Sequence, residues 1–199
     1  VYSSILVSGK FVYRYLPKKR LEVDDFPTCN LLVRKSIMQE LGGFRTNFWP
    51  GEDTKLCLDI TKKLGKKIIY EPGVLVYHHR RPLYLPHIKQ IASYALHRGY
   101  FVKVYPSTSL RLPYFIPSVL LLSLLLGGVC SLFSGSLRLV YLSYVSLYIL
   151  LTFAYSLYYK EPRLTPSIFL GIISTHIAYG AYFLKGFLSA SLPEERQKI

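Results

Sequence analysis

Three long uncharged runs in the C-terminal part of the chain constrain its fold most strongly. They are Leu112–Phe133, Leu139–Tyr159 and Leu164–Leu184, with 22, 21 and 21 residues. A helix needs about 20 mostly apolar residues to cross the hydrocarbon core of a bilayer. A buried core helix is the alternative for any one run, but three in succession would need a very large soluble layer around them. The pattern therefore predicts three transmembrane helices.

Charge is concentrated before these runs. Residues 1–111 hold 19 of the 25 Lys and Arg residues, and the whole chain has a formal net charge of +14. With 51% hydrophobic residues, the chain is too apolar for intrinsic disorder. Its three cysteines lie far apart, without the spacing of a metal site or a disulfide framework. We therefore expect a basic polar module followed by membrane helices.

Basic residues beside the apolar runs predict the orientation. The connection after the first run holds one basic residue, Arg138, whereas the second connection holds Lys160 and Arg163. Further basic residues precede the first run. Because Lys and Arg are enriched on the cytoplasmic side of membrane proteins, residues 1–111 are expected to face the cytoplasm. The sequence thus predicts an integral membrane protein with a cytoplasmic N-terminal module.

Within the module, periodicity and turn residues predict an α/β arrangement. Ser36–Gln39 has the pattern of a capping box that opens a short helix, which ends at Gly42-Gly43. A longer helix follows Asp53. Lys67–Glu71 and Val74–His78 have the composition of two strands separated by a Pro-Gly turn.

The segment Pro86–Phe101 is amphipathic and comes shortly before the first apolar run. Two expectations stay open for it. As a helix rich in nearby tyrosines it suits the bilayer interface, and as an ordinary amphipathic helix it suits packing on the α/β core.

Two adjacent carboxylates, Glu52 and Asp53, follow a Pro-Gly turn and open the longer helix. A helix N-terminus stabilises negative charge, so Asp53 is expected to be ionised there. An ionised carboxylate on a rigid mount is what a general base needs to take a proton from a hydroxyl. An acidic cap without a catalytic role is the commoner use of such a pair.

A basic pattern, His78-His79-Arg80-Arg81, ends the second expected strand. Successive strand residues point to opposite faces, so the two histidines are not expected to serve the same site. Imidazole binds divalent metals and guanidinium groups hold phosphate, which suits a metal-bound, phosphate-bearing ligand. A basic juxtamembrane patch attracted to anionic lipid is the other interpretation.

Several separated motifs occur in a fixed order over roughly residues 20–100. They are Cys29-Asn30, Arg34-Lys35, Leu41-Gly42-Gly43-Phe44, Gly51-Glu52-Asp53, Pro72 and Val76-Tyr77-His78. This order resembles the C-terminal half of a family 2 glycosyltransferase. Such enzymes have the GT-A fold, a nucleotide-sugar-binding α/β domain, and their membrane-bound members carry an interface helix and C-terminal spans.

The resemblance implies an organisation for the whole chain. Residues 1–83 would form part of the GT-A-like catalytic domain, and residues 84–111 an interface helix with a linker. Three transmembrane helices, residues 112–133, 139–159 and 164–184, and a polar tail, residues 185–199, would follow.

The resemblance also implies roles for matched residues. Asp53 would act as general base on the acceptor hydroxyl of an inverting enzyme, with Glu52 as its neighbour. His78 would help to bind a divalent metal, Mg or Mn, on the donor diphosphate. Substrate-binding roles would fall to Asn30, Gly42 and Gly43 near the acceptor-side loops, and to the basic residues Arg80, Arg81 and Arg98.

The sequence departs from the family pattern in three ways. The metal-binding Asp-x-Asp is absent, since Asp24-Asp25 has another spacing, and a glycine-rich nucleotide-binding opening is missing as well. The Gln-x-x-Arg-Trp signature of processive synthases is also absent. We therefore expect the remaining metal ligands upstream of Val1, a non-processive enzyme, and no activity from residues 1–199 alone.

The predicted function is transfer of a sugar from a nucleotide-sugar donor to a lipid-linked or polysaccharide acceptor, as in polysaccharide biosynthesis of the cell envelope. The alternative is a non-catalytic membrane protein whose basic cytosolic module binds anionic lipid or a partner protein. Nucleic-acid binding, which the charge alone would favour, is not expected because no nucleic-acid-binding motif accompanies the apolar runs.

Overall fold

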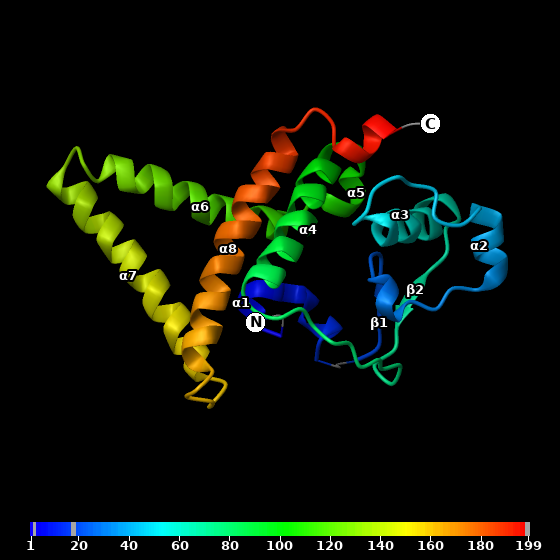
Figure 1. The fold of residues 1–199 in the computed structure, drawn as a ribbon, viewed down its shortest axis with the longest axis horizontal. Helices are drawn as coiled ribbons and strands as arrows, with labels where there is room; N and C mark the ends of the chain where they lie inside the picture. The colour runs from blue at the N-terminus through cyan, green and yellow to red at the C-terminus, as the bar shows by residue number, and fades with distance from the viewer. Residues whose placement is uncertain (2, 17–18, 198–199) are drawn as a thin grey trace.

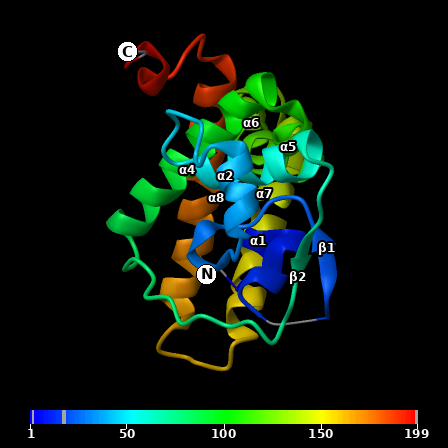
Figure 2. The ribbon, with the colours of Figure 1, turned by 90° about the vertical axis from the view of Figure 1, so that its right-hand side faces the viewer.

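The computed structural model describes residues 1, 3–16 and 19–197 and is mostly helical (Figure 1). Residues 198–199 of the expected polar tail lie outside this range. Figure 2 looks onto a small N-terminal module, with the long helices behind it. From here on, the module means the described residues before Leu85, where the first long helix begins. The GT-A-type α/β domain expected for residues 1–83 is only partly visible, because the module contains one short two-stranded sheet among its described residues.

Long helices form the larger part of the structure. They are α4 (Leu85–Val104), α6 (Leu112–Cys130), α7 (Gly135–Leu157) and α8 (Thr165–Leu188), with the short α5 (Pro106–Ser109) between the first two. By length and composition, α6, α7 and α8 can cross a membrane. The three predicted apolar helices are therefore present. Only 6% of the most apolar stretch of α6, and of α7, is buried, which leaves large apolar side chains on their outer surfaces.

Helices α4 and α8 lie side by side along much of their length (Figures 1 and 2). Glycines permit this close approach. A Cβ atom added at Gly99 would lie 2.1 Å from the carbonyl oxygen of Phe183, and one at Gly186 would lie 1.9 Å from that of Leu96. Small residues let two helix backbones come together in this way. The amphipathic segment thus packs mainly on another long helix.

The module consists of short elements around a small core. They are α1 (Ile5–Ser8), η1 (Gly9–Arg14), β1 (Leu21–Val23), η2 (Thr28–Asn30), α2 (Lys35–Leu41), α3 (Glu52–Leu58), the π-helix η3 (Asp59–Lys63) and β2 (Ile68–Tyr70). Strands β1 and β2 are antiparallel, with Leu21 opposite Tyr70 and Val23 opposite Ile68. The core beneath them includes Phe26, Leu56 and Cys57.

The module contacts the long helices in several places. Near the N-terminus, the backbone N–H of Ile5 donates to the Tyr155 hydroxyl at 3.0 Å, and the carbonyl of Leu6 lies 2.9 Å from His176 Nε2. On the other side, the ring of Phe48 packs edge-on against that of Phe101 in α4, with centroids 5.1 Å apart. Helix α4 therefore contacts both α8 and the module.

Local predictions for the module are confirmed in part. Helix α2 ends at Gly42 in the left-handed conformation, as expected, and β2 lies within the predicted strand Lys67–Glu71. The capping box is wrong, since Arg34 precedes the helix, Ser36 lies inside it and no side chain caps it.

The prediction of a strand at Val74–His78 is also wrong. Residues 74–82 have no regular structure, and every residue from 73 to 82 is exposed. A strand needs the backbone of a neighbour to pair with, and β-branched composition alone cannot supply one. Within the described part of the chain, β2 pairs with β1 and leaves this segment outside the sheet.

Candidate active site

Asp53 lies in the first turn of α3, directly against α4. Gly51 precedes the helix with φ of 132°, a backbone conformation that residues with a side chain rarely adopt. A Cβ atom at this position would lie 2.5 Å from Cζ of Phe101, so the backbone of Gly51 sits on the Phe101 ring. The glycine thus allows α3 to begin at the surface of α4.

The environment of Asp53 makes it a stronger base than an exposed aspartate. Burial raises its pKa above the ordinary value, and the nearby negative charge of Asp25 raises it further. The backbone N–H of Thr54, which donates to Asp53 Oδ1 at 2.7 Å, opposes this shift, and Arg98 does so more weakly. The helix N-terminus was expected to favour the ionised form, but burial outweighs it.

Asp25 is the centre of a buried polar cluster. It is 3% exposed, and its Oδ2 lies 3.0 Å from Nη2 of Arg98 and 4.0 Å from Nη2 of Arg14. Arg14 also donates to the backbone carbonyl of Asp25. The hydroxyl of Thr54 donates to Asp25 Oδ1 at 3.4 Å. A buried carboxylate requires such partners, because an unpaired charge in the interior is very costly.

The sequence analysis missed Asp25, since it considered Asp24-Asp25 only as a possible metal motif. In the structure the two aspartates pair with different arginines, Asp25 with Arg98 and Arg14 and Asp24 with Arg111. Arg111 donates to Asp24 with Nη1 at 3.1 Å and Nη2 at 2.6 Å, and this pair is more exposed. Two adjacent carboxylates before the apolar Phe26, in a chain with 25 Lys and Arg residues against 11 Asp and Glu residues, were the available signal.

Arg98, predicted to bind substrate, is surrounded by protein groups. Besides Asp25, it donates to the Thr54 hydroxyl at 3.3 Å and lies over the Tyr114 ring, 4.9 Å from its centroid. Burial is the largest influence and disfavours its charge, but the combined attraction of Asp25, Tyr114, Tyr179 and Asp53 outweighs burial, and the pKa of Arg98 is raised. Direct substrate binding by Arg98 stays a prediction.

His78, Arg80 and Arg81 all lie in the exposed segment after β2. Figure 1 shows this segment running from β2 to the start of α4, on the other side of the sheet from α3. Arg80 lies over the Tyr15 ring, 4.8 Å from its centroid. The structure therefore does not bring His78 next to Asp53, and the facing argument for the two histidines is wrong because no strand holds them.

The described residues do not fit a metal site by themselves. No group of three or more His, Cys, Asp or Glu side chains gathers in residues 1, 3–16 and 19–197. His78 alone supplies one ligand, whereas divalent ions such as Mg²⁺ are held by several. Metal binding by His78 stays a prediction.

The remaining predicted residues lie around α2 and η2. Asn30 donates from Nδ2 to the carbonyl of Val74 at 3.1 Å, which is a structural use of the amide. Gly42 and Gly43, with φ of 73° and 80°, turn the chain after α2. Their substrate-binding roles are not tested by this arrangement.

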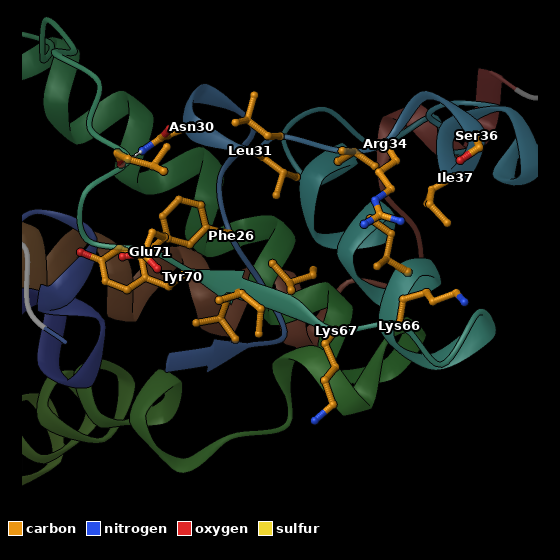
Figure 3. Close-up of a pocket in the computed structure, with 17 residues that line it drawn as sticks. Phe26, Asn30, Leu31, Arg34, Ser36, Ile37, Lys66, Lys67, Tyr70 and Glu71 are labelled. Atoms are coloured by element: carbon orange, nitrogen blue, oxygen red, sulfur yellow. Dashed lines mark hydrogen bonds between the residues drawn. The ribbon is translucent and has the colours of Figure 1, made fainter. Parts of the chain in front are cut away.

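A hollow of about 670 Å³ lies beside β2 (Figure 3). Its wall is mixed: the apolar side includes Phe26, Ile68 and Tyr70, and the polar residues include Asn30, Arg34, Lys66, Lys67 and Glu71. Asp53 does not line it. The hollow and the Asp53 carboxylate are thus separate features of the module.

Comparison with known proteins gives one match. A family model described as Glycosyl transferase family group 2 matches residues 9–160, a range that includes Asp53, His78 and the first two apolar helices. No curated protein and no solved structure matches the chain.

Proposed function

The chain belongs to glycosyl transferase family group 2, and on that premise we propose that it transfers a sugar from a nucleotide-sugar donor to an acceptor hydroxyl, with Asp53 as the base. The observation that carries this proposal is the position of Asp53. It stands at the start of α3 within the Glu-Asp motif, and its surroundings raise its pKa towards the range in which a general base works best.

The proposed reaction is a single displacement. Asp53 takes the proton of the acceptor hydroxyl while the oxygen of that hydroxyl forms a bond to the anomeric carbon of the donor sugar. The bond between that carbon and the diphosphate oxygen breaks, and the nucleoside diphosphate leaves with the electron pair. One displacement inverts the anomeric configuration. Glu52 accepts a hydrogen bond from the Gly51 N–H at 2.9 Å, so its proposed part is to fix the turn beside Asp53.

The acceptor is proposed to be lipid-linked or a polysaccharide at the membrane surface. Three helices of membrane-crossing length support a location at the bilayer. The exposed basic residues Arg80 and Arg81 support an anionic ligand, such as a lipid phosphate. We propose that this module faces the cytoplasm and that transfer is non-processive.

The test uses membranes that contain the full-length protein. Asp53→Asn should lower turnover by roughly 100-fold, because general base catalysis contributes about that much, while donor binding changes little. Asp59→Asn is the matched control, since Asp59 lies in the same helical segment and pairs with Lys55. Sugar transfer is measured with a panel of radiolabelled nucleotide-sugars, and donor binding by equilibrium dialysis.

Two results would contradict the proposal. Wild-type turnover in Asp53→Asn would remove Asp53 as the base. Binding to vesicles of anionic lipid that survives Asp53→Asn, with no sugar transfer from any donor, would favour a non-catalytic basic module instead.

A further inference from the structure

Three side chains from distant parts of the chain close a triangle of hydrogen bonds beside Asp53. Arg98 Nη2 donates to Asp25 Oδ2 at 3.0 Å and to Thr54 Oγ1 at 3.3 Å, and the Thr54 hydroxyl donates to Asp25 Oδ1 at 3.4 Å. The one hydroxyl proton of Thr54 thus goes to Asp25, while its oxygen accepts from Arg98. Each member of the triangle is hydrogen-bonded to the other two.

The triangle joins three parts of the chain that are far apart in the sequence. Asp25 follows β1, Thr54 belongs to α3, and Arg98 lies in the middle of α4. Asp25 and Thr54 are 3% and 2% exposed and the Arg98 side chain is 18% exposed, so water has little access to these hydrogen bonds. A shift of α3 along α4 would leave a buried charge without its partner, which is strongly unfavourable.

The part of α4 that carries Arg98 also packs closely against α8. Gly99, the next residue after Arg98, packs against the backbone of Phe183 in α8. The position of Arg98 is therefore set by the α4–α8 contact, and the position of Thr54 is set by Arg98. Thr54 in turn holds Asp53 through the 2.7 Å hydrogen bond from its backbone N–H.

We infer that Asp25 and Arg98 are positioning residues for Asp53: through Thr54 they lock the first turn of α3 to α4, and so hold the Asp53 carboxylate at a fixed place relative to the membrane helices. This inference rests on the proposed role of Asp53 as the base. A base must meet the acceptor hydroxyl within hydrogen-bond reach, and a displacement of about 1 Å can cost roughly 100-fold in rate.

Electrostatics distinguish this role from a purely structural one. The charged groups that act on Asp53 are Asp25 and Glu52, which raise its pKa, and Arg98, which lowers it. Removing Asp25 and removing Arg98 should therefore shift the titration of Asp53 in opposite directions. If the two substitutions only loosened the fold, both would shift the pKa of Asp53 in the same direction, towards that of an exposed aspartate.

The experiment uses the full-length protein in membranes and has two readouts. The first is the pH titration of Asp53 itself, obtained from infrared difference spectra between each variant and the same variant carrying Asp53→Asn. The second is the pH profile of kcat and KM for sugar transfer. The infrared readout does not depend on activity.

Asp25→Asn should lower the pH at which Asp53 loses its proton, and Arg98→Gln should raise it. Arg98→Lys keeps the charge but lacks the planar fork, so it should leave the titration near that of the wild type. All three variants should lower kcat by roughly 10–100-fold and leave the KM for the donor unchanged, since they misplace the base without touching the donor.

The matched control is the neighbouring pair Asp24–Arg111, which also joins the module to the helices but does not contact Thr54. Asp24→Asn and Arg111→Gln should alter neither the titration nor kcat. If Arg98→Gln fails to fold, the double variant Asp25→Asn/Arg98→Gln removes both charges of that pair, and Arg14 keeps its hydrogen bond to the backbone carbonyl of residue 25. It should fold and still show the loss in kcat.

Unchanged titration of Asp53 and unchanged kcat in Asp25→Asn and in the double variant would overturn the inference. Shifts of the same sign in Asp25→Asn and Arg98→Gln would also overturn it. Opposite shifts, together with wild-type turnover in Asp53→Asn, would support the coupling to Asp53 while refuting the proposed function.

Discussion

The backbone of Gly51 rests against the ring of Phe101, so close that a Cβ atom on the glycine would come within 2.5 Å of Cζ. This contact brings the start of α3, and with it Glu52 and Asp53, to the surface of α4. Phe101 is 1% exposed and is also packed by Phe48, which precedes the same turn. The candidate base is therefore mounted on the helix that packs against α8.

Gly51→Ala should destabilise the protein by about 1–3 kcal/mol, because the new side chain meets both a strained backbone and the Phe101 ring. The thermal unfolding of the detergent-solubilised protein measures this effect. Gly73→Ala is the control, since a Cβ atom there meets nothing within 4 Å. Equal unfolding temperatures for the two variants would contradict the packing of Gly51 on α4.

Asp53→Asn should increase stability at neutral pH even as it removes activity. The pKa of Asp53 is raised in the folded state, so the folded protein binds this proton more tightly than the unfolded chain does. The stability from protonated Asp53 is present at low pH and is lost as the pH rises through the folded pKa. Asparagine does not titrate, so the variant does not lose this stability as the pH rises.

Unfolding temperatures of Asp53→Asn and the wild type, measured from acid to neutral pH, test this prediction. The advantage of the variant should grow as the pH rises and vanish at acid pH. Asp59→Asn should behave oppositely and destabilise slightly, because it removes the pair with Lys55. A variant that is less stable than the wild type at neutral pH would show that Asp53 is not held in a desolvated site.

Gly99→Ala should loosen the packing of α4 on α8. The added Cβ atom would lie 2.1 Å from the backbone carbonyl oxygen of Phe183, which cannot change rotamer to make room as a side chain can. Overpacking of this kind costs about 1–3 kcal/mol. Gly135→Ala, at a position with nothing within 4 Å, is the control. Thermal unfolding measures the effect. An unchanged unfolding temperature in Gly99→Ala would rule out this contact between α4 and α8.

Labels on the two connections should report opposite sides of the membrane. Cysteines placed at Ser134 and Glu161 are treated with a membrane-impermeant thiol reagent in sealed vesicles whose interior is the cytoplasmic side. Only Glu161→Cys, on that side, should be protected from the reagent. The exposed Cys29 and Cys130 must first be replaced by serine. Cys57 can stay, since it is fully buried and burial raises its pKa to about 12, which leaves little reactive thiolate.

If both labels react from the same side, α7 does not cross the bilayer. If they react from opposite sides but Ser134→Cys is the protected one, the helices cross in the reverse orientation, and the module is not cytoplasmic.

Local patterns in the sequence were sufficient for the features that depend on a few neighbouring residues. Uncharged runs of about 20 residues predicted the apolar helices α6, α7 and α8. The turn at Gly42 and the strand β2 were also predictable, because a left-handed glycine and a β-rich run are local signals. The Glu-Asp motif pointed to the start of α3, although not to its surroundings.

Partners and burial were decided only by tertiary structure. Asp25 and Arg98 are 73 positions apart, and nothing local to either residue indicates the other. The extended composition of Val74–His78 did not produce a strand, since pairing depends on which backbone lies alongside. The pKa of Asp53 rises because α4 and Asp25 exclude water and add charge, against what its helix position alone predicts. Apolar helices and glycine turns follow from neighbouring residues, whereas strand pairing, solvation and charge depend on segments that only packing brings together.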